Sequence, residues 1–267
     1  MRIHHLNCAT MCPVAWSLFG LRDMICHCLL VETDAHGLVL VDTGFGTGDV
    51  TDPSHLGGAF RGLVRPKLDV AETALRQVEA LGFRAADVRH ILPTHLDLDH
   101  AGGLPDFPET TVHIYKKERD AALARATWRE KERYKTRHVA HGPKWEPYEV
   151  QGEPWNGFEC VRDLKGLPPE ILLVPTVGHT RGHVAVAIEG PGGWLVHAGD
   201  AYFHKDEMHP EKPSCPRPLA IFQSTMGIDG ASRRHNAERL RVMARETKVS
   251  IFSAHDADEL DRERARA

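Results

Sequence analysis

The stretch that decides the fold is ILPTHLDLDHAGGLPDF, residues 91–107. An apolar run typical of a strand ends at Thr94. Four side chains that can bind a metal then follow within six positions: His95, Asp97, Asp99 and His100. Imidazole and carboxylate groups together suit zinc, manganese, iron or similar divalent ions. The stretch therefore predicts a metal site at the end of a strand.

The same arrangement recurs three times further along the chain. An apolar run precedes His179 in VPTVGHT, Asp200 in WLVHAGD and His255 in SIFSAHD. Side chains that follow several strands can converge at one rim of a sheet sandwich. Seven candidate ligands are too many for one tetrahedral ion, but they suit two ions that share a carboxylate. We therefore expect a dinuclear centre.

Apolar runs, turns and helical patterns alternate along the chain. Two groups of strands with helices between them predict a layered α/β sandwich, in one domain over residues 1–267. We expect helices at 70–82 and throughout 116–138, and a helical cap-like insertion around 116–150. Cys26 and Cys28 are expected in a strand, and Cys8 and Cys12 in a loop.

Composition excludes several classes of partner. Of 267 residues, 42% are hydrophobic, and the formal net charge is −4, which does not favour broad binding to nucleic acid or to an anionic membrane. No apolar run approaches the roughly 20 residues that span a bilayer, and the N-terminus lacks the apolar stretch of a signal peptide. We expect a cytoplasmic protein that binds a small molecule. A homodimer is possible through the N-terminal segment and residues 125–150.

Five motifs together carry a family resemblance: VDTGFG, THLDLDHAGG, GHTRGH, HAGD and SAHD. Their order and spacing resemble the metallo-β-lactamase-fold superfamily, and within it the branch of N-acyl homoserine lactonases and glyoxalase II. The resemblance covers about residues 26–256. It implies a four-layer αββα sandwich and a metal-dependent hydrolase.

The resemblance also implies roles for single residues. It assigns one ion to His95, Asp97 and His179, a second ion to Asp99, His100 and His255, and the bridging position to Asp200. Asp99 would also handle a proton near the leaving group. Asp42 would orient a ligand or the loop backbone, and His183 resembles a position used for packing or hydrogen bonding.

The chain departs from the family at Asp97. The family pattern His-x-His-x-Asp-His reads here His-x-Asp-x-Asp-His. A carboxylate is a competent ligand, so we expect Asp97 to bind the first of two divalent ions. Zinc is expected first, with manganese or iron favoured more than at an all-imidazole site. The alternative is a weak or empty first site, which would leave a one-metal enzyme or a ligand-binding relic.

The expected reaction is hydrolysis, in which a metal-bridging hydroxide attacks a carbonyl of a lactone or carboxylic ester. Lactonases of the branch hold the carbonyl with a tyrosine at the position of Phe203. Tyr202, one residue earlier, is the candidate here. Two other hydrolases stay open: a thioester hydrolase resembling glyoxalase II, and a phosphodiesterase that would use the basic stretch 116–137.

Overall fold

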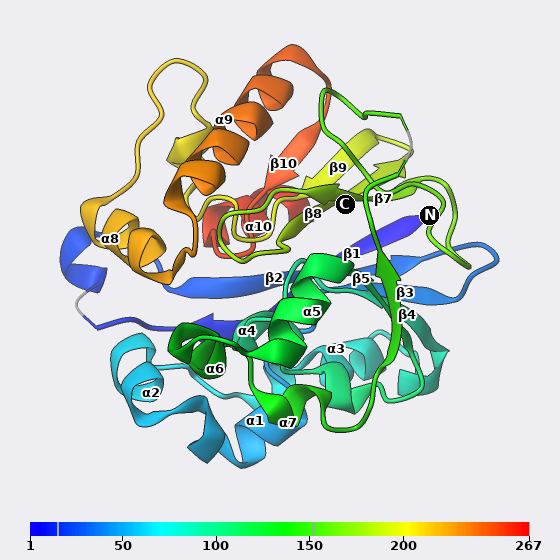
Figure 1. Ribbon diagram of the computed structural model, residues 1–267, viewed down its shortest axis with the longest axis horizontal. Coiled ribbons are helices and arrows are strands. Elements are labelled where there is room, and N and C mark those ends of the chain that lie inside the picture. The colour runs from blue at the N-terminus through cyan, green and yellow to red at the C-terminus, as the bar shows by residue number, and fades with distance from the viewer. Residues whose placement is uncertain (15, 152, 267) are drawn as a thin grey trace.

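The computed structural model describes residues 1–14, 16–151 and 153–266, and it has two sheets packed face to face with helices outside (Figure 1). Neighbouring strands of the first sheet are, in order, β1 (Arg2–Met11), β2 (Met24–Glu32), β3 (Leu38–Val41), β4 (Val88–Leu92), β5 (Thr111–Tyr115) and β6 (Lys144–Tyr148). The order of the second sheet is β10 (Ser250–Phe252), β9 (Gly193–His197), β8 (Val184–Gly190) and β7 (Ile171–Pro175). The predicted αββα sandwich is confirmed.

Helices cover both outer faces. The α-helices are α1 (Thr47–Thr51), α2 (Gly58–Val64), α3 (Ala74–Ala80), α4 (Leu98–Ala101), α5 (Lys116–Ala124), α6 (Trp128–Arg133), α7 (Thr136–Val139), α8 (Arg217–Met226), α9 (Gly230–Glu246) and α10 (Ala257–Arg264). Short 3₁₀ helices are η1 (Trp16–Phe19), η2 (Pro53–Leu56), η3 (Val70–Glu72), η4 (Ala85–Asp87), η5 (Leu104–Asp106) and η6 (Lys205–Met208). In Figure 1, α9 lies above the second sheet, and α1, α3 and α7 lie below the first.

Strand direction brings several strand ends to one rim. β3 pairs with β4 in parallel, and β9 pairs with β10 in parallel. β7 and β9 are both antiparallel to β8, so they run in the same direction as each other. The carboxyl ends within each of these sets therefore share an edge of their sheet, where the next residues of the chain can meet.

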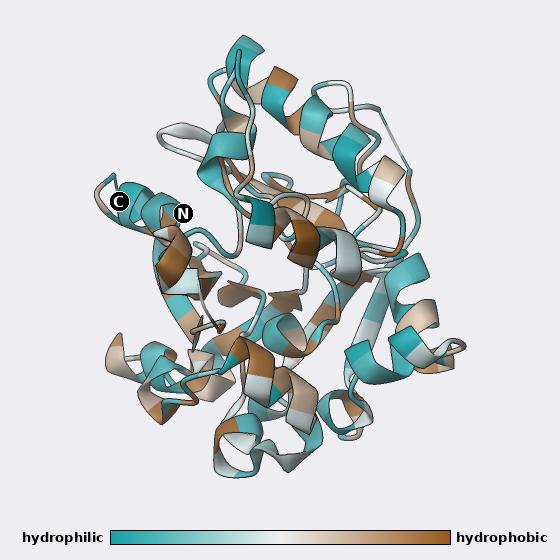
Figure 2. Cartoon of the chain, turned by 90° about the vertical axis from the view of Figure 1, so that its left-hand side faces the viewer, coloured by the Kyte–Doolittle hydropathy of each residue, from teal (hydrophilic) through white to brown (hydrophobic). Residues whose placement is uncertain are grey.

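One part of the core lies between the two sheets, and two further clusters lie between each sheet and its helices. Val39 and Val41 of β3 belong to the same buried cluster as Leu173 of β7 and Val186 of β8. In Figure 2 the inner strands show hydrophobic colour, and the outer helices carry both hydrophilic and hydrophobic residues. Burial of this apolar surface is the main force that holds the layers together.

One local expectation was wrong, and two were right in helical content but wrong in continuity. Cys8 lies in β1 rather than in a loop, because residues 2–11 pair along β2. The expected helix 70–82 is divided into η3 and α3 by Thr73, which caps α3. The expected helix 116–138 is three helices: Arg125 adopts a left-handed conformation that ends α5, and Thr127 with Glu130 forms a capping box that starts α6.

No helix within the described parts of the chain is long and apolar enough to cross a membrane.

A buried carboxylate in α5 ties the two loops that follow β4 and β7. Glu118 is 1% exposed and accepts hydrogen bonds from the backbone N–H of Leu96 at 3.0 Å and of Gly182 at 3.0 Å, and from the hydroxyl of Thr180 at 2.7 Å. A Cβ at position 182 would lie 2.1 Å from the backbone nitrogen of Glu118, so only glycine permits this approach. Both sheets are thus joined at the rim through one side chain.

We expect Glu118→Ala to lower the free energy of unfolding by about 3 kcal/mol or more, because two buried N–H groups lose their acceptor. Glu149→Ala is the matched control, since this exposed glutamate pairs with Lys116 at the surface. Its loss should be below about 1 kcal/mol. Urea denaturation of both variants measures the difference, and equal losses would contradict the role given to Glu118.

Candidate functional site

The seven predicted ligands lie together at the rim where the strands end. His95 follows β4, and Asp97 is the N-cap of α4, the helix that carries Asp99 and His100. His179, Asp200 and His255 follow β7, β9 and β10. Six of the seven are buried, namely His95, Asp97, His100, His179, Asp200 and His255.

Asp200 stands at the centre, and imidazoles surround both of its oxygens. Its Oδ2 lies 3.2 Å from Nε2 of His179 and 3.8 Å from Nε2 of His95. Its Oδ1 lies 3.3 Å from Nε2 of His100 and 3.1 Å from Nε2 of His255, which also lies 3.2 Å from Oδ2. The carboxylate thus stands between two groups of side chains.

We call these groups the Asp97 group and the Asp99 group. The Asp97 group holds His95 and His179, whose Nε2 atoms lie 3.4 and 3.0 Å from Oδ2 of Asp97. The Asp99 group holds His100 and His255, whose Nε2 atoms lie 3.9 and 3.8 Å from Oδ2 of Asp99. The donor atoms of His95, Asp97 and His179 lie within 4.8 Å of one another, as do those of His95, His100 and Asp200, and such sets can surround a small cation.

Hydrogen bonds at the far side of each ring orient the imidazoles of the Asp99 group. Nδ1 of His100 lies 2.8 Å from Oδ2 of Asp42, and Nδ1 of His255 lies 2.8 Å from the carbonyl of Ile25. Asp42 also accepts from the backbone N–H and hydroxyl of Thr94, and it adopts a positive φ of 57°. A proton held on each Nδ1 leaves Nε2 as the nitrogen that can bind a cation beside Asp200.

His183 supports Asp200 from behind. Its Nδ1 lies 3.0 Å from the carbonyl of Thr176, and its Nε2 accepts the backbone N–H of Asp200 at 2.8 Å. Both nitrogens are therefore used, and the ring fixes the loop that carries Asp200.

Burial and neighbouring charges shift the pKa values of the side chains in this cluster in opposite directions. Burial opposes ionisation of Asp200, but the surrounding histidines outweigh it and hold its pKa well below the usual range. Burial alone would lower the pKa of His100, yet Asp200, Asp42 and Asp99 raise it well above normal. Burial, together with Arg133, lowers the pKa of His179 to about 4. The pKa of a histidine is thus raised in the Asp99 group and lowered in the Asp97 group.

Several donor atoms are buried without a hydrogen-bond partner among the described residues, including Nε2 of His95, Nε2 of His100 and Oδ1 of Asp200. Such atoms are costly unless something else satisfies them. A divalent cation would accept all three lone pairs. The donor set at this rim therefore fits a metal ion.

Arg133, at the end of α6, is a member of the site that the sequence did not single out. Its side chain is buried, and Nη1 lies 2.5 Å from Oδ2 of Asp97 and 3.0 Å from Nε2 of His179. Nη2 donates to the carbonyl of Met226. Burial opposes ionisation of Asp97, but Arg133 and His95 outweigh it and hold its pKa well below the usual range.

The two aromatic residues after Asp200 face different ways. The hydroxyl of Tyr202 donates to the carboxylate of Glu259 at 3.0 Å, and its ring packs in the buried cluster against α9. Phe203 stacks on His255, with ring centroids 4.8 Å apart. In this conformation Phe203 borders the ligand cluster, and the hydroxyl of Tyr202 is held elsewhere.

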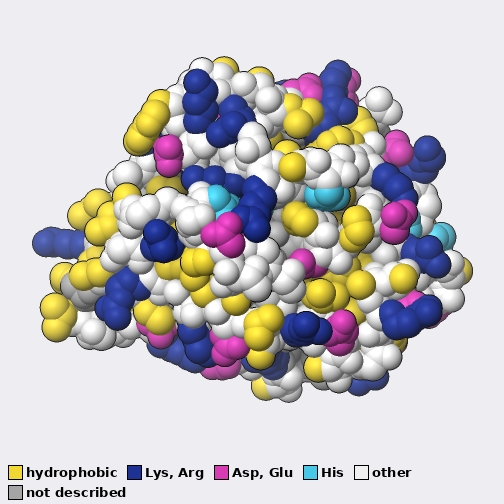
Figure 3. Space-filling view, turned by 90° about the horizontal axis from the view of Figure 1, so that it is seen from below, with side chains coloured by type: hydrophobic (Ala, Val, Ile, Leu, Met, Phe, Trp, Pro, Cys, Tyr) yellow, Lys and Arg dark blue, Asp and Glu magenta, His cyan; other side chains and the backbone are white. Residues whose placement is uncertain are grey.

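The basic stretch 116–137 holds nine Lys and Arg residues, most of which have partners within the protein. Acidic partners are Glu149 for Lys116, Asp120 for Arg119, Asp97 for Arg133, Glu132 for Lys135 and Asp52 for Arg137. Figure 3 shows the face seen from below, where basic and acidic side chains are interspersed. This pairing gives little support to a phosphate-binding platform.

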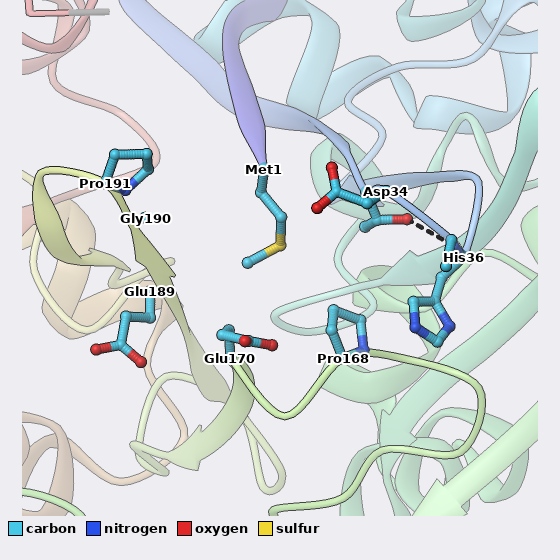
Figure 4. Close-up of a pocket in the computed structure, with 10 residues that line it drawn as sticks. Met1, Asp34, His36, Pro168, Glu170, Glu189, Gly190 and Pro191 are labelled. Carbon is cyan, nitrogen blue, oxygen red and sulfur yellow. Dashed lines mark hydrogen bonds between the residues drawn. The ribbon is translucent and has the colours of Figure 1, made fainter.

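A separate hollow lies at the opposite ends of the strands. Met1, the turn 33–36 between β2 and β3, Glu170 before β7 and the residues Glu189–Pro191 line it (Figure 4). Its carboxylates are Asp34, Glu170 and Glu189. Because these residues precede the strands whose carboxyl ends carry the ligands, the hollow is distinct from the ligand cluster.

Comparison with known proteins agrees with this geometry. A probable metallo-hydrolase of Mycobacterium tuberculosis is 42% identical over 260 residues, which cover 97% of this chain and 81% of the relative. An N-acyl homoserine lactonase of Bacillus thuringiensis is 27% identical over 234 residues, which cover 87% of this chain and 81% of the relative.

A solved N-acyl homoserine lactone hydrolase, with the product N-hexanoyl-L-homoserine at its catalytic metal centre, superposes with a TM-score of 0.73 at 24% identity. The match covers 97% of this chain and 95% of that one. The sequence profile of the Metallo-beta-lactamase superfamily matches residues 21–255. The chain therefore belongs to the metallo-β-lactamase superfamily and is a metallo-hydrolase by relationship.

Proposed function

We propose that this protein is a metal-dependent hydrolase of lactones or related carboxylic esters. The observation that carries the proposal is the position of Asp200, whose two oxygens face two groups of buried imidazoles and carboxylates. The residues proposed to hold metal are His95, Asp97, Asp99, His100, His179, Asp200 and His255. Zinc is the first candidate ion, with manganese or iron as alternatives, and the number of ions depends on Arg133.

A divalent ion at this rim would act as a Lewis acid toward a carbonyl oxygen and would lower the pKa of water. Residues of the chain orient the imidazole ligands and exchange protons. Asp42 and the carbonyl of Ile25 orient His100 and His255. Asp99 is the most exposed carboxylate of the cluster, at 14% of its side chain, which suits it to exchange a proton with a leaving group.

An apolar cluster beside the ligands supports an acyl substrate. Phe203 packs with Phe222 of α8, and Phe222 packs with Trp16 of η1. Leu18 of η1 and Ile221 of α8 are strongly exposed. Figure 1 shows η1 and α8 side by side, and Figure 2 faces this side of the molecule. An apolar chain attached to the scissile carbonyl would contact this surface, and lactonase relatives act on acyl lactones.

Removal of metal should abolish turnover. After chelation and desalting, hydrolysis of an N-acyl homoserine lactone should fall at least about 100-fold, because several kcal/mol of transition-state stabilisation are lost. Added Zn²⁺ or Mn²⁺ should restore it, as followed by proton release at constant pH. Asp200→Asn should lose the activity, and Asp206→Asn, an exposed carboxylate in η6, should keep it.

The same assay distinguishes the candidate substrate classes. An aryl ester, a glutathione thioester and a phosphodiester are compared with the lactone at equal concentration. Faster cleavage of the phosphodiester or the thioester than of the lactone and the ester would overturn the substrate assignment, while the dependence on metal would stand.

Asp42→Asn should weaken metal binding about 10-fold to 100-fold, because the carboxylate no longer orients His100. Competition with a chromophoric chelator measures the change without any assay of activity. Asp87→Asn is the control, since Asp87 is a surface carboxylate paired with Arg84. Unchanged affinity in Asp42→Asn would show that Asp42 does not support a metal ligand.

A further inference from the structure

Arg133 lies among the atoms that a first metal ion would need. Nη1 donates to Oδ2 of Asp97, the oxygen that faces both His95 and His179. It also lies 3.0 Å from Nε2 of His179, and because a guanidinium can only donate, this nitrogen is the acceptor. An ion in the Asp97 group would need Nε2 of His179 together with an oxygen of Asp97. The guanidinium therefore competes with an ion for Nε2 of His179 and for Oδ2 of Asp97, and its positive charge lies where the charge of the ion would lie.

The guanidinium is firmly held in this position. Nη2 donates to the carbonyl of Met226 at the end of α8, so the planar group is fixed at two of its nitrogens. Its side chain is only 5% exposed. An arginine cannot lose its charge in a protein, so it cannot become neutral to admit a cation.

The Asp99 group has no cationic side chain bonded to it among the described residues. Nε2 of His100 and Oδ1 of Asp200 have no hydrogen-bond partner among the described residues. They lie 3.3 Å apart, and Nε2 of His255 lies 3.1 Å from the same oxygen. Nε2 of His255 also lies 3.2 Å from Oδ2 of Asp200, and no lysine or arginine among the described residues donates to these atoms. In the Asp97 group, Nε2 of His95 and Oδ1 of Asp97 also lack a partner, so the two groups differ in the bound guanidinium and not in the presence of unpaired atoms.

We propose that the guanidinium of Arg133 takes the place of one of the two metal ions expected at this rim, so that the chain holds a single divalent ion on His100, Asp200 and His255 with Asp99. The proposal rests on the metal centre put forward above and changes its composition. Asp97 and His179 then bind an arginine side chain rather than an ion.

The exchange explains why residue 97 is a carboxylate. A neutral histidine at this position would leave the buried guanidinium without a counter-charge, which is strongly unfavourable. Asp97 supplies that charge at 2.5 Å. Asp97, the residue that departs from the family motif, and the buried Arg133 thus form one ion pair.

The test counts ions in the intact protein. Wild-type protein stripped with chelator, incubated with excess Mn²⁺ and desalted should contain one ion per chain by elemental analysis. Its electron paramagnetic resonance spectrum should be that of isolated Mn²⁺. Arg133→Ala should contain two ions, and the spectrum should show coupling, because ions that share Asp200 would be close enough to interact.

Arg129→Ala is the matched control. Arg129 lies one turn earlier on α6, and it donates to the carbonyl of Thr225, next to the partner of Arg133. This variant removes a positive charge and a tether from the same helix without touching the ligands, so it should keep one isolated ion. If Arg133→Ala fails to fold, the double variant Asp97→His with Arg133→Met removes both buried charges and should bind two coupled ions.

Each result decides between the proposals. Two coupled ions in the wild-type protein would overturn the replacement by Arg133 and leave the metal-dependent hydrolase intact. One ion in every folded variant would also overturn it, because the guanidinium would not be what excludes the second ion. No bound ion in the wild-type protein, with Zn²⁺ or with Mn²⁺, would overturn the proposed function itself.

Discussion

The rim of the sandwich depends on the compensation of buried charge. Asp42, Asp97 and Asp200 are almost inaccessible to solvent, and an isolated buried carboxylate is strongly unfavourable. Each has a positive or proton-donating partner: His100 for Asp42, Arg133 for Asp97 and the imidazoles for Asp200. Loops from both sheets supply these partners, so the charges hold the two sheets together at this end.

Much of this site could be predicted from the sequence because each ligand directly follows an apolar strand. Strand runs are visible as short apolar segments, and the next polar residues must lie at the rim. Parallel pairing of β3 with β4 and of β9 with β10 then places Asp42 near His100, and Asp200 near His255. The motif order was sufficient to identify the sandwich.

The role of Arg133 could not be predicted from the sequence, because it depends on how the helices around it begin and end. Arg133 is one of nine basic residues between 116 and 137, and nothing in its neighbours separates it from the others. Its reach toward Asp97 depends on where α5 ends, at a left-handed Arg125, and on the capping box that starts α6. Tyr202 raises a similar difficulty, because β9 has ended at His197 and strand alternation no longer tells which side chain turns toward the metal ligands.

The Arg133 guanidinium also connects the charged centre with the apolar surface beside it. Its second contact is the carbonyl of Met226, the last residue of α8. The same helix carries Phe222, which packs on Phe203, and Phe203 stacks on His255. A shift of the guanidinium would therefore release the end of α8, and a movement of α8 would change the surroundings of His255. The position of the Arg133 guanidinium among the ligands and the shape of the apolar surface therefore depend on each other.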